Sequence, residues 1–219
     1  MKDRYSILVG LIFLALVAVA ALHTLRGGGG EGTLGLDFQP PRWPLPEFAV
    51  PAAAGSLEGD ANVAQDDCAS GALPCPADAR RDPACEIHLA GAIRVCDLFD
   101  RPLVLSFWFT KGGDCADRQD VVNTVYRRYR GRVNFLSIDI RDDRETVREL
   151  IRSHGWTMPV GYDHDGAVAS LYRIGGCPTF AYAYPGGTLQ SAGIGDLSVG
   201  QLEARVRRLL AATKAAEAG

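Results

Sequence analysis

The chain has 219 residues, a formal net charge of −3 and six cysteines. This length leaves room for one medium-sized domain with appended segments. The charge gives no basis for nucleic-acid binding, since the basic residues are spread along expected helices as solvated faces. An even and high number of cysteines is typical of proteins that form disulfides in an oxidising compartment.

The first 26 residues are expected to be a membrane anchor or a signal segment. A short charged stretch precedes an apolar run from Ile7 to Leu22 that contains no charged residue. In one interpretation this run is a single transmembrane helix, with Lys2 and Arg4 keeping the N-terminus in the cytoplasm. In the other it is a signal peptide with a small-residue cleavage site at 18–20. In both interpretations the rest of the chain is exported. The length of the apolar run favours the membrane anchor.

Residues 27–66 are expected to form a flexible linker rich in glycine and proline. Four glycines follow the apolar segment directly, and a proline-rich stretch surrounds Trp43. Such compositions are typical of flexible and extended chains. We expect no regular structure here, although Trp43 or Phe48 could dock on the domain.

Residues 67–99 form a Cys-rich extension. It contains four of the six cysteines, namely Cys68, Cys75, Cys85 and Cys96. Residues 85–89 and 92–96 predict the two arms of a hairpin that turns at Ala90 and Gly91. A two-residue turn places Cys85 opposite Cys96, within disulfide distance, and leaves Cys68 and Cys75 as a second pair. Six cysteines allow many disulfide pairings, so pairings other than this one stay open.

Zinc binding is the alternative interpretation of the same region. Its ligands would be Cys75, Cys85, His88 and Cys96. The spacing is irregular and lacks paired C-x-x-C motifs, and an oxidising compartment favours disulfides. The metal interpretation is therefore the weaker one.

The remaining residues alternate strand and helix patterns. Residues 103–109 form a continuous apolar run, which indicates a strand buried on both faces. The elements expected after it are a helix (116–130), a strand (133–140), a helix (142–154), a short helix (166–174), two strands (180–184 and 188–194) and a final helix (197–212). This order predicts an α/β domain with a layered sheet over residues 100–214.

Cys115 follows the buried strand through a loop with two glycines and opens the first expected helix. The partial positive charge and free N–H groups of a helix N-terminus favour a thiolate over a thiol. Asp114 opposes this effect, because an adjacent carboxylate raises a thiol pKa, unless its side chain caps the helix. Trp108, His154 and His164 are expected to be packing or surface residues.

This pattern resembles the thioredoxin-like superfamily, in its exported, often membrane-anchored TlpA-type thiol–disulfide branch with the related peroxiredoxins. The resemblance covers residues 100–213. It rests on three segments and on their order along the chain. They are residues 105–108 before the cysteine turn, residues 176–180 before a strand, and the hairpin turn at residues 185–187. It implies a three-layer α/β/α sandwich with a mixed central sheet, and a cis bond at Pro178 facing the active cysteines. It implies no metal and no organic cofactor.

The chain departs from the W-C-x-x-C motif of this family. Gly112 occupies the place of the first cysteine, and only Cys115 keeps its thiol. The peroxiredoxin pattern P-x-x-x-T-x-x-C is also incomplete, because Trp108 and Gly112 replace its proline and threonine. A second thiol, Cys177, immediately precedes the expected cis proline, in a loop that abuts the active helix in this fold. We therefore expect Cys115 and Cys177 to form a pair beside Pro178.

Two functions are compatible with these residues. The first is a thiol–disulfide oxidoreductase outside the cell membrane, in which Cys115 attacks and Cys177 resolves the mixed disulfide. Its substrates would be protein thiols or disulfides, and a partner protein would supply the redox equivalents. The second is a catalytically degenerate binding module in which the two cysteines form a structural bond or stay inert. A peroxidase using Cys115 is a third and weaker hypothesis.

Overall fold

The computed structural model describes residues 36, 42–59, 83–111 and 115–218. The chain divides into two units, 1–32 and 33–219, and every described residue lies in the second. The expected anchor or signal segment, Cys68 and Cys75 therefore lie outside the described residues. Among those described, no helix has the length and apolar character needed to cross a membrane.

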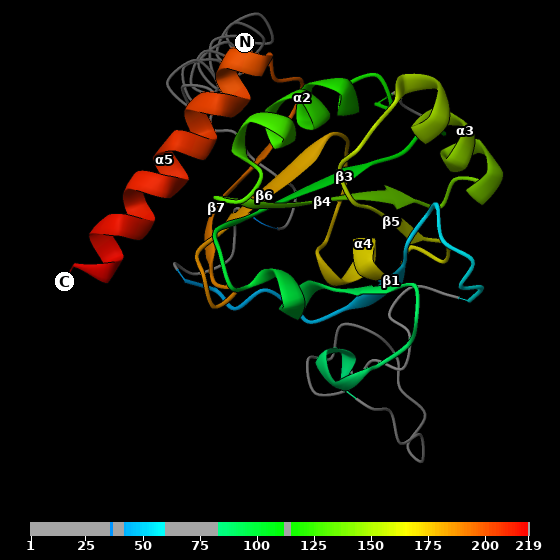
Figure 1. Cartoon of the computed structure of the whole chain (residues 1–219), viewed down its shortest axis with the longest axis horizontal. Helices are drawn as coiled ribbons and strands as arrows, with labels where there is room; N and C mark the ends of the chain where they lie inside the picture. The colour runs from blue at the N-terminus through cyan, green and yellow to red at the C-terminus, as the bar shows by residue number, and fades with distance from the viewer. Residues whose placement is uncertain (1–35, 37–41, 60–82, 112–114, 219) are drawn as a thin grey trace, which may run out of the picture. The chain divides into compact units, whose positions relative to one another are not determined.

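A five-stranded mixed sheet forms the centre of the domain, in the order β5-β4-β3-β6-β7 (Figure 1). Strand β3 (Leu103–Trp108) pairs in parallel with β4 (Asn134–Ile140), which pairs in parallel with β5 (Val160–Asp163). On its other side β3 pairs antiparallel with β6 (Thr179–Ala183), and β6 with β7 (Leu189–Ile194). The predicted mixed sheet is confirmed, and every residue of β3 is buried, as its apolar run predicts.

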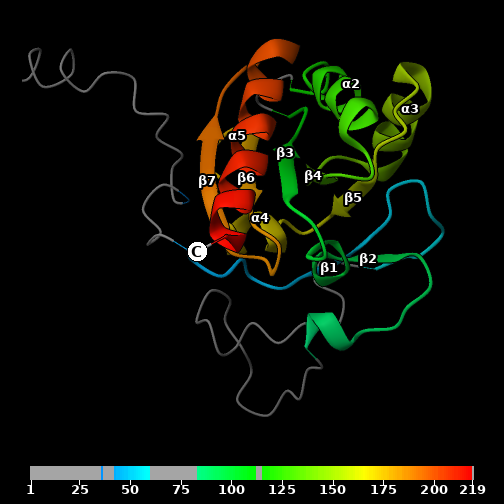
Figure 2. The same ribbon diagram turned by 60° about the vertical axis from the view of Figure 1, so that its left-hand side comes forward.

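Helices cover both faces of this sheet (Figures 1 and 2). Helices α2 (Gln119–Tyr129), α3 (Arg144–His154) and α5 (Val199–Glu217) contribute buried side chains to the hydrophobic cluster on one face. The short helix α4 (Ala167–Leu171) contributes to the cluster on the other. The result is the α/β/α layering that the resemblance implies.

Residues 42–59, which we call the strap, belong to the packed domain. At one end the strap joins the β7 side of the sheet, where the Leu45 N–H donates to the Gly187 carbonyl oxygen at 2.8 Å. At its other end the strap joins the β5 edge of the sheet, where the Ala53 N–H donates to the carbonyl oxygen of Val160 at 2.9 Å. Phe48 is fully buried between these ends, in the same cluster as α4. The prediction of a flexible linker was therefore wrong for 42–59, because its apolar side chains complete the second face of the sheet.

The predicted hairpin of the Cys-rich extension is also wrong. The chain turns at Ala90 and Gly91, but its first arm contains a 3-10 helix, η2 (Ala84–Glu86). The second arm, β2 (Ala92–Arg94), pairs instead with strand β1 (Ala49–Pro51) of the strap and leads into a 3-10 helix, η3 (Val95–Leu98). The strap thus takes the place of the expected partner strand.

Strand β5 escaped the sequence analysis, because it is short and contains a glycine and an aspartate. Gly161 has a packing reason in the structure. A Cβ atom at this position would lie 2.6 Å from Cγ2 of Val50 in the strap, far too close for two carbon atoms. Glycine therefore lets the strap approach the edge of the sheet.

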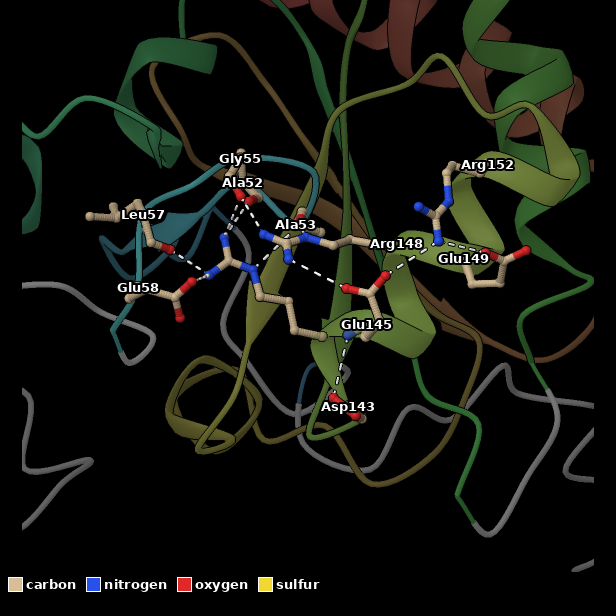
Figure 3. A network of polar contacts seen from close by, with 11 residues as sticks. Ala52, Ala53, Gly55, Leu57, Glu58, Asp143, Glu145, Arg148, Glu149 and Arg152 are labelled. Atoms are coloured by element: carbon tan, nitrogen blue, oxygen red, sulfur yellow. Dashed lines mark hydrogen bonds and ion pairs between the residues drawn. The ribbon is translucent and has the colours of Figure 1, made fainter.

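Two arginines of α3 hold the end of the strap (Figure 3). The guanidinium group of Arg144 donates to the backbone carbonyl oxygens of four strap residues. They are Leu57 at 2.5 Å, Gly55 at 2.9 Å, Ala52 at 3.1 Å and Ala53 at 3.4 Å. Arg148 adds a bond to Gly55 at 2.7 Å. Since the Arg144 side chain is only 10% exposed, these hydrogen bonds are shielded from water.

Replacing Arg144 by methionine is expected to release the end of the strap. The change leaves carbonyl oxygens without donors, and we expect it to lower the free energy of unfolding by about 2 kcal/mol. Limited proteolysis should then cut within residues 52–59, and mass spectrometry would locate the cut.

Arg152→Met is the matched control. Arg152 lies on the same helix, but its partners Glu145 and Glu149 are exposed side chains. Exposed ion pairs contribute little to stability. Equal cleavage of the strap in both variants would show that Arg144 does not hold it.

Candidate functional site

Two loops meet where β3 ends and β6 begins. The loop after β3 leads to Cys115, and the loop before β6 contains Cys177 and Pro178. Phe107 of β3 lies opposite Thr179 of β6 in the antiparallel ladder, so the end of one strand is beside the start of the other. The peptide bond between Cys177 and Pro178 is cis.

Cys115 and Cys177 are joined by a disulfide in the structure, with their Cα atoms 6.0 Å apart. Both lie beside the carbonyl oxygen of Phe109. The backbone N–H of Cys115 donates to this oxygen at 3.4 Å, and Sγ of Cys177 lies 3.8 Å from it. Phe109 is thus a shared neighbour of the two bonded residues.

The two cysteines differ in burial. Cys115 is 7% exposed and belongs to the hydrophobic cluster that contains Trp108 and Trp156. Cys177 is half-buried and packs against the margin of the same cluster. A molecule arriving from solvent therefore meets Cys177 first.

Cys115 lies one turn ahead of α2 and not in its first turn, which corrects the expected position. Its carbonyl oxygen accepts from the Arg118 N–H at 3.2 Å, in a run of i→i+3 turns that leads into the helix. Helix α2 itself begins at Gln119, whose buried side-chain oxygen accepts from the hydroxyl groups of Ser106 and Ser137 at 3.1 and 3.0 Å. These bonds fix the start of α2 to the two central strands.

The start of the loop after β3 is held by Asp142. One carboxylate oxygen accepts from the Thr110 N–H at 2.6 Å, and the other accepts from the Thr110 hydroxyl at 2.7 Å. Lys111 reaches the carbonyl oxygen of Arg141 at 3.4 Å. This role of Asp142 was not predicted, because Asp142 is the first residue of the expected helix 142–154, where an aspartate is ordinarily interpreted as part of a cap.

The other side chains considered at the sequence level have structural partners. Trp108 is fully buried and packs edge-on against Trp156, with ring centroids 5.5 Å apart. His154 lies 3.0 Å from the Asp120 carboxylate, which also accepts from Nε1 of Trp156 at 2.6 Å. His164 contacts the Tyr162 hydroxyl at 3.1 Å. These contacts agree with packing and surface roles.

Cys85 and Cys96 form a second disulfide, with Cα atoms 5.8 Å apart. Both residues are half-buried, and the Arg94 side chain donates to the Cys85 carbonyl oxygen at 3.0 Å. Zinc binds cysteine as a thiolate, and neither sulfur atom of a disulfide is a thiolate. The disulfide between Cys85 and Cys96 therefore does not fit the zinc alternative. His88 of that ligand set lies 3.3 Å from Arg94.

Comparisons with known proteins give relatives of one kind. No protein-family model matches the chain. A thiol-disulfide oxidoreductase named ResA from Oceanobacillus iheyensis is 27% identical over 112 residues, which cover 51% of this chain and 58% of that protein. Thiol-disulfide oxidoreductase YkuV from Bacillus subtilis is 24% identical over 120 residues, covering 52% and 81%. The chain thus matches less than two thirds of the first relative.

Solved structures share the fold at low identity. A putative protein disulfide isomerase from Bacteroides thetaiotaomicron superposes with a TM-score of 0.57 at 14% identity, covering 81% of this chain and 92% of that one. A putative thiol:disulfide interchange protein DsbE from Chlorobium tepidum gives a TM-score of 0.56 at 15% identity, covering 78% and 98%. The chain is therefore similar in sequence to thiol-disulfide oxidoreductases, and it shares the thioredoxin-like fold of these solved structures.

Proposed function

We propose that the chain is a thiol–disulfide oxidoreductase that acts on protein thiols outside the cytoplasmic membrane. One observation carries this proposal. The disulfide between Cys115 and Cys177 lies at the end of the central strand, directly before the cis bond to Pro178. With Gly112 in place of the first cysteine of the family motif, the pair is divided between two loops.

The burial of the two residues favours Cys177 as the sulfur that meets the substrate. A substrate thiolate attacks Sγ of Cys177, a mixed disulfide forms, and Cys115 leaves as a thiolate. The second substrate thiolate then attacks the substrate sulfur of the mixed disulfide and releases Cys177. The substrate has lost two electrons and gained a disulfide, while the protein holds two thiols. This order reverses the roles expected from the sequence, where Cys115 was the attacking residue.

A second redox protein is required to complete a cycle. A partner disulfide reoxidises Cys115 and Cys177 through the same two exchanges, and the partner is reduced. Run backwards, the same steps reduce a substrate disulfide with electrons from a partner dithiol. The exchange uses sulfur chemistry alone.

The expected location is the outer side of the cytoplasmic membrane, with residues 7–22 as the anchor. The uninterrupted apolar run supports this location, and so do the six cysteines, since disulfides persist in oxidising compartments. Cleavage of the run as a signal peptide would give a secreted protein with the same domain.

The burial of Cys115 also supports a second function, a binding module with a permanent disulfide. A bond that closes a long loop and lies against the core is a suitable structural constraint. Single-cysteine variants separate the two functions.

Cys115→Ser leaves Cys177 as the free thiol, and Cys177→Ser leaves Cys115. We expect Cys177 to react with a maleimide at neutral pH about tenfold faster than Cys115, because reactive thiols are accessible ones. Peptide mapping after timed quenching gives both rates. Equal rates, or a faster Cys115, would contradict the proposed order of attack.

Substrate capture tests the activity itself. In the native compartment, Cys115→Ser should accumulate mixed disulfides with other proteins through Cys177, and reductant should release them. The control is the double variant Cys115→Ser/Cys177→Ser, which keeps the other four cysteines. If both variants capture the same proteins, the pair does not perform the exchange and the binding function is favoured.

A further inference from the structure

An ion pair at the surface joins the two segments that carry the disulfide. Arg118 lies three residues after Cys115, and its Nη2 atom is 2.9 Å from Oδ2 of Asp196, in the loop between β7 and α5. The two side chains are 50% and 59% exposed. The exchange proposed above gives this pair no role, although each member is connected to one of the bonded cysteines.

Backbone hydrogen bonds make these connections. The Arg118 N–H donates to the Cys115 carbonyl oxygen at 3.2 Å. On the other side, the Gly195 N–H donates at 3.0 Å to the carbonyl oxygen of Pro178, the residue after Cys177. Gly195 directly precedes the acidic member of the pair. Its φ of +110° is a conformation that residues with a side chain rarely adopt, so glycine permits this turn.

The ion pair and the disulfide therefore close the same ring of residues. One half of the ring is the turn 115–118, and the other half consists of residues 177–178 and 195–196. Two links that close one ring each lower the entropy cost of forming the other, because the ends are already close together. After reduction of the disulfide, the ion pair still restrains the two halves.

We propose that Arg118 and Asp196 are positioning residues for exchange at this disulfide. When a substrate is bound to Cys177 in a mixed disulfide, the ion pair keeps the Cys115 thiolate close to it, so that the bond between the two cysteines can close again. This inference rests on the proposed function for the exchange itself. It adds the side chains that hold the two halves of the site together.

The other acidic side chains near Arg118 in the sequence have a different partner. The Asp120 carboxylate lies 3.0 Å from Nδ1 of His154, and Oδ1 of Asp117 lies 3.9 Å from Nε2 of the same ring. Within the described part of the chain, Asp196 is thus the one acidic group in ion-pair contact with Arg118. Removing the charge of Arg118 therefore deletes one defined ion pair.

The exposure of the ion pair determines the size of its effect. Ion pairs in contact with solvent change an equilibrium by a few fold, and salt screens them. Global stability should therefore change little when this pair is removed. The equilibrium between the bonded and the reduced cysteines should change measurably, because opening the disulfide also weakens the ion pair.

Arg118→Gln tests the proposal, since it removes the charge and keeps most of the side chain. The full-length protein is equilibrated with mercaptoethanol and its disulfide, both uncharged, and mass spectrometry measures the fraction of Cys115 and Cys177 that is bonded. Two reagent thiols become one reagent disulfide, while the protein disulfide takes up their two electrons and two protons. We expect the equilibrium constant for this reduction to rise about threefold in the variant, which is about 14 mV toward easier reduction.

Arg128→Gln is the matched control. Arg128 near the end of α2 lies 2.6 Å from Glu203 of α5, so it also forms an exposed ion pair between the two parts of the chain. It lies at the opposite end of α2 from Cys115 and outside the ring that the disulfide closes. The equilibrium constant of this variant should keep the wild-type value.

Charge exchange shows whether the interaction itself, and not either side chain alone, is responsible. Arg118→Asp/Asp196→Arg should restore the wild-type equilibrium constant. Arg118→Asp alone should shift it further than Arg118→Gln, because two carboxylates then face each other. Raising the salt concentration from about 0.05 to about 0.5 M should move the wild type toward Arg118→Gln and leave that variant unchanged.

Hydrogen exchange at the Gly195 amide gives a readout that does not require redox chemistry. In Cys115→Ser/Cys177→Ser the ring lacks its disulfide, and adding Arg118→Gln should lower the protection of this amide about threefold. The same change should have a smaller effect while the disulfide is intact. Failure to capture substrates would contradict the proposed function and leave this result standing.

Three results would each overturn the proposal. They are a wild-type equilibrium constant in Arg118→Gln at low salt, an equal shift in Arg128→Gln, and unchanged protection of the Gly195 amide in the serine background. If the thiol reagent never opens the wild-type disulfide, the proposed exchange fails. The Gly195 measurement then still decides whether the ion pair holds the two halves of the ring.

Discussion

The antiparallel pairing of β3 with β6 determines where the two cysteines meet. It places the chain after Phe107 beside the chain before Thr179, so residues separated by 62 positions form one bond. A C-x-x-C motif closes within a single helical turn, whereas this bond closes a long loop. In the loop-entropy model such closure stabilises the oxidised domain by about 4 kcal/mol. For a two-electron couple this energy corresponds to roughly 90 mV between the pair in the folded domain and the same pair in the unfolded chain.

Three consecutive residues at the start of α3 connect the main parts of the domain. Asp142 binds the loop that leads to Cys115, Asp143 caps the helix by accepting from the Glu145 N–H, and Arg144 holds the end of the strap. The loop, the helix and the strap therefore share one short segment as their support. The strap also covers one face of the sheet. Its buried side chains pack in the same hydrophobic cluster as those of β3, the strand that precedes the disulfide.

The apolar runs and turn residues were sufficient to predict β3, a layered α/β domain and the main helices, because burial dictates their residue patterns. The mixed order of the sheet was implied by the resemblance. Pairing of Cys115 with Cys177 was expected from the resemblance and from Cys177 preceding the cis proline. The strap and the role of Asp142 could not be predicted. Arg144 donates to backbone carbonyl oxygens, which every residue carries. No residue pattern in 42–59 therefore predicts that Arg144 binds there.

The most direct test of the central claim is a redox titration of the full-length protein, with every cysteine mapped by mass spectrometry across glutathione potentials. The claim is that Cys115 and Cys177 form an exchangeable pair. We expect them to interconvert between bonded and free with a midpoint between about −270 and −120 mV, the range of known oxidoreductases. If the bond persists below about −300 mV, or the two cysteines never bond, the account of this site as a redox centre is contradicted.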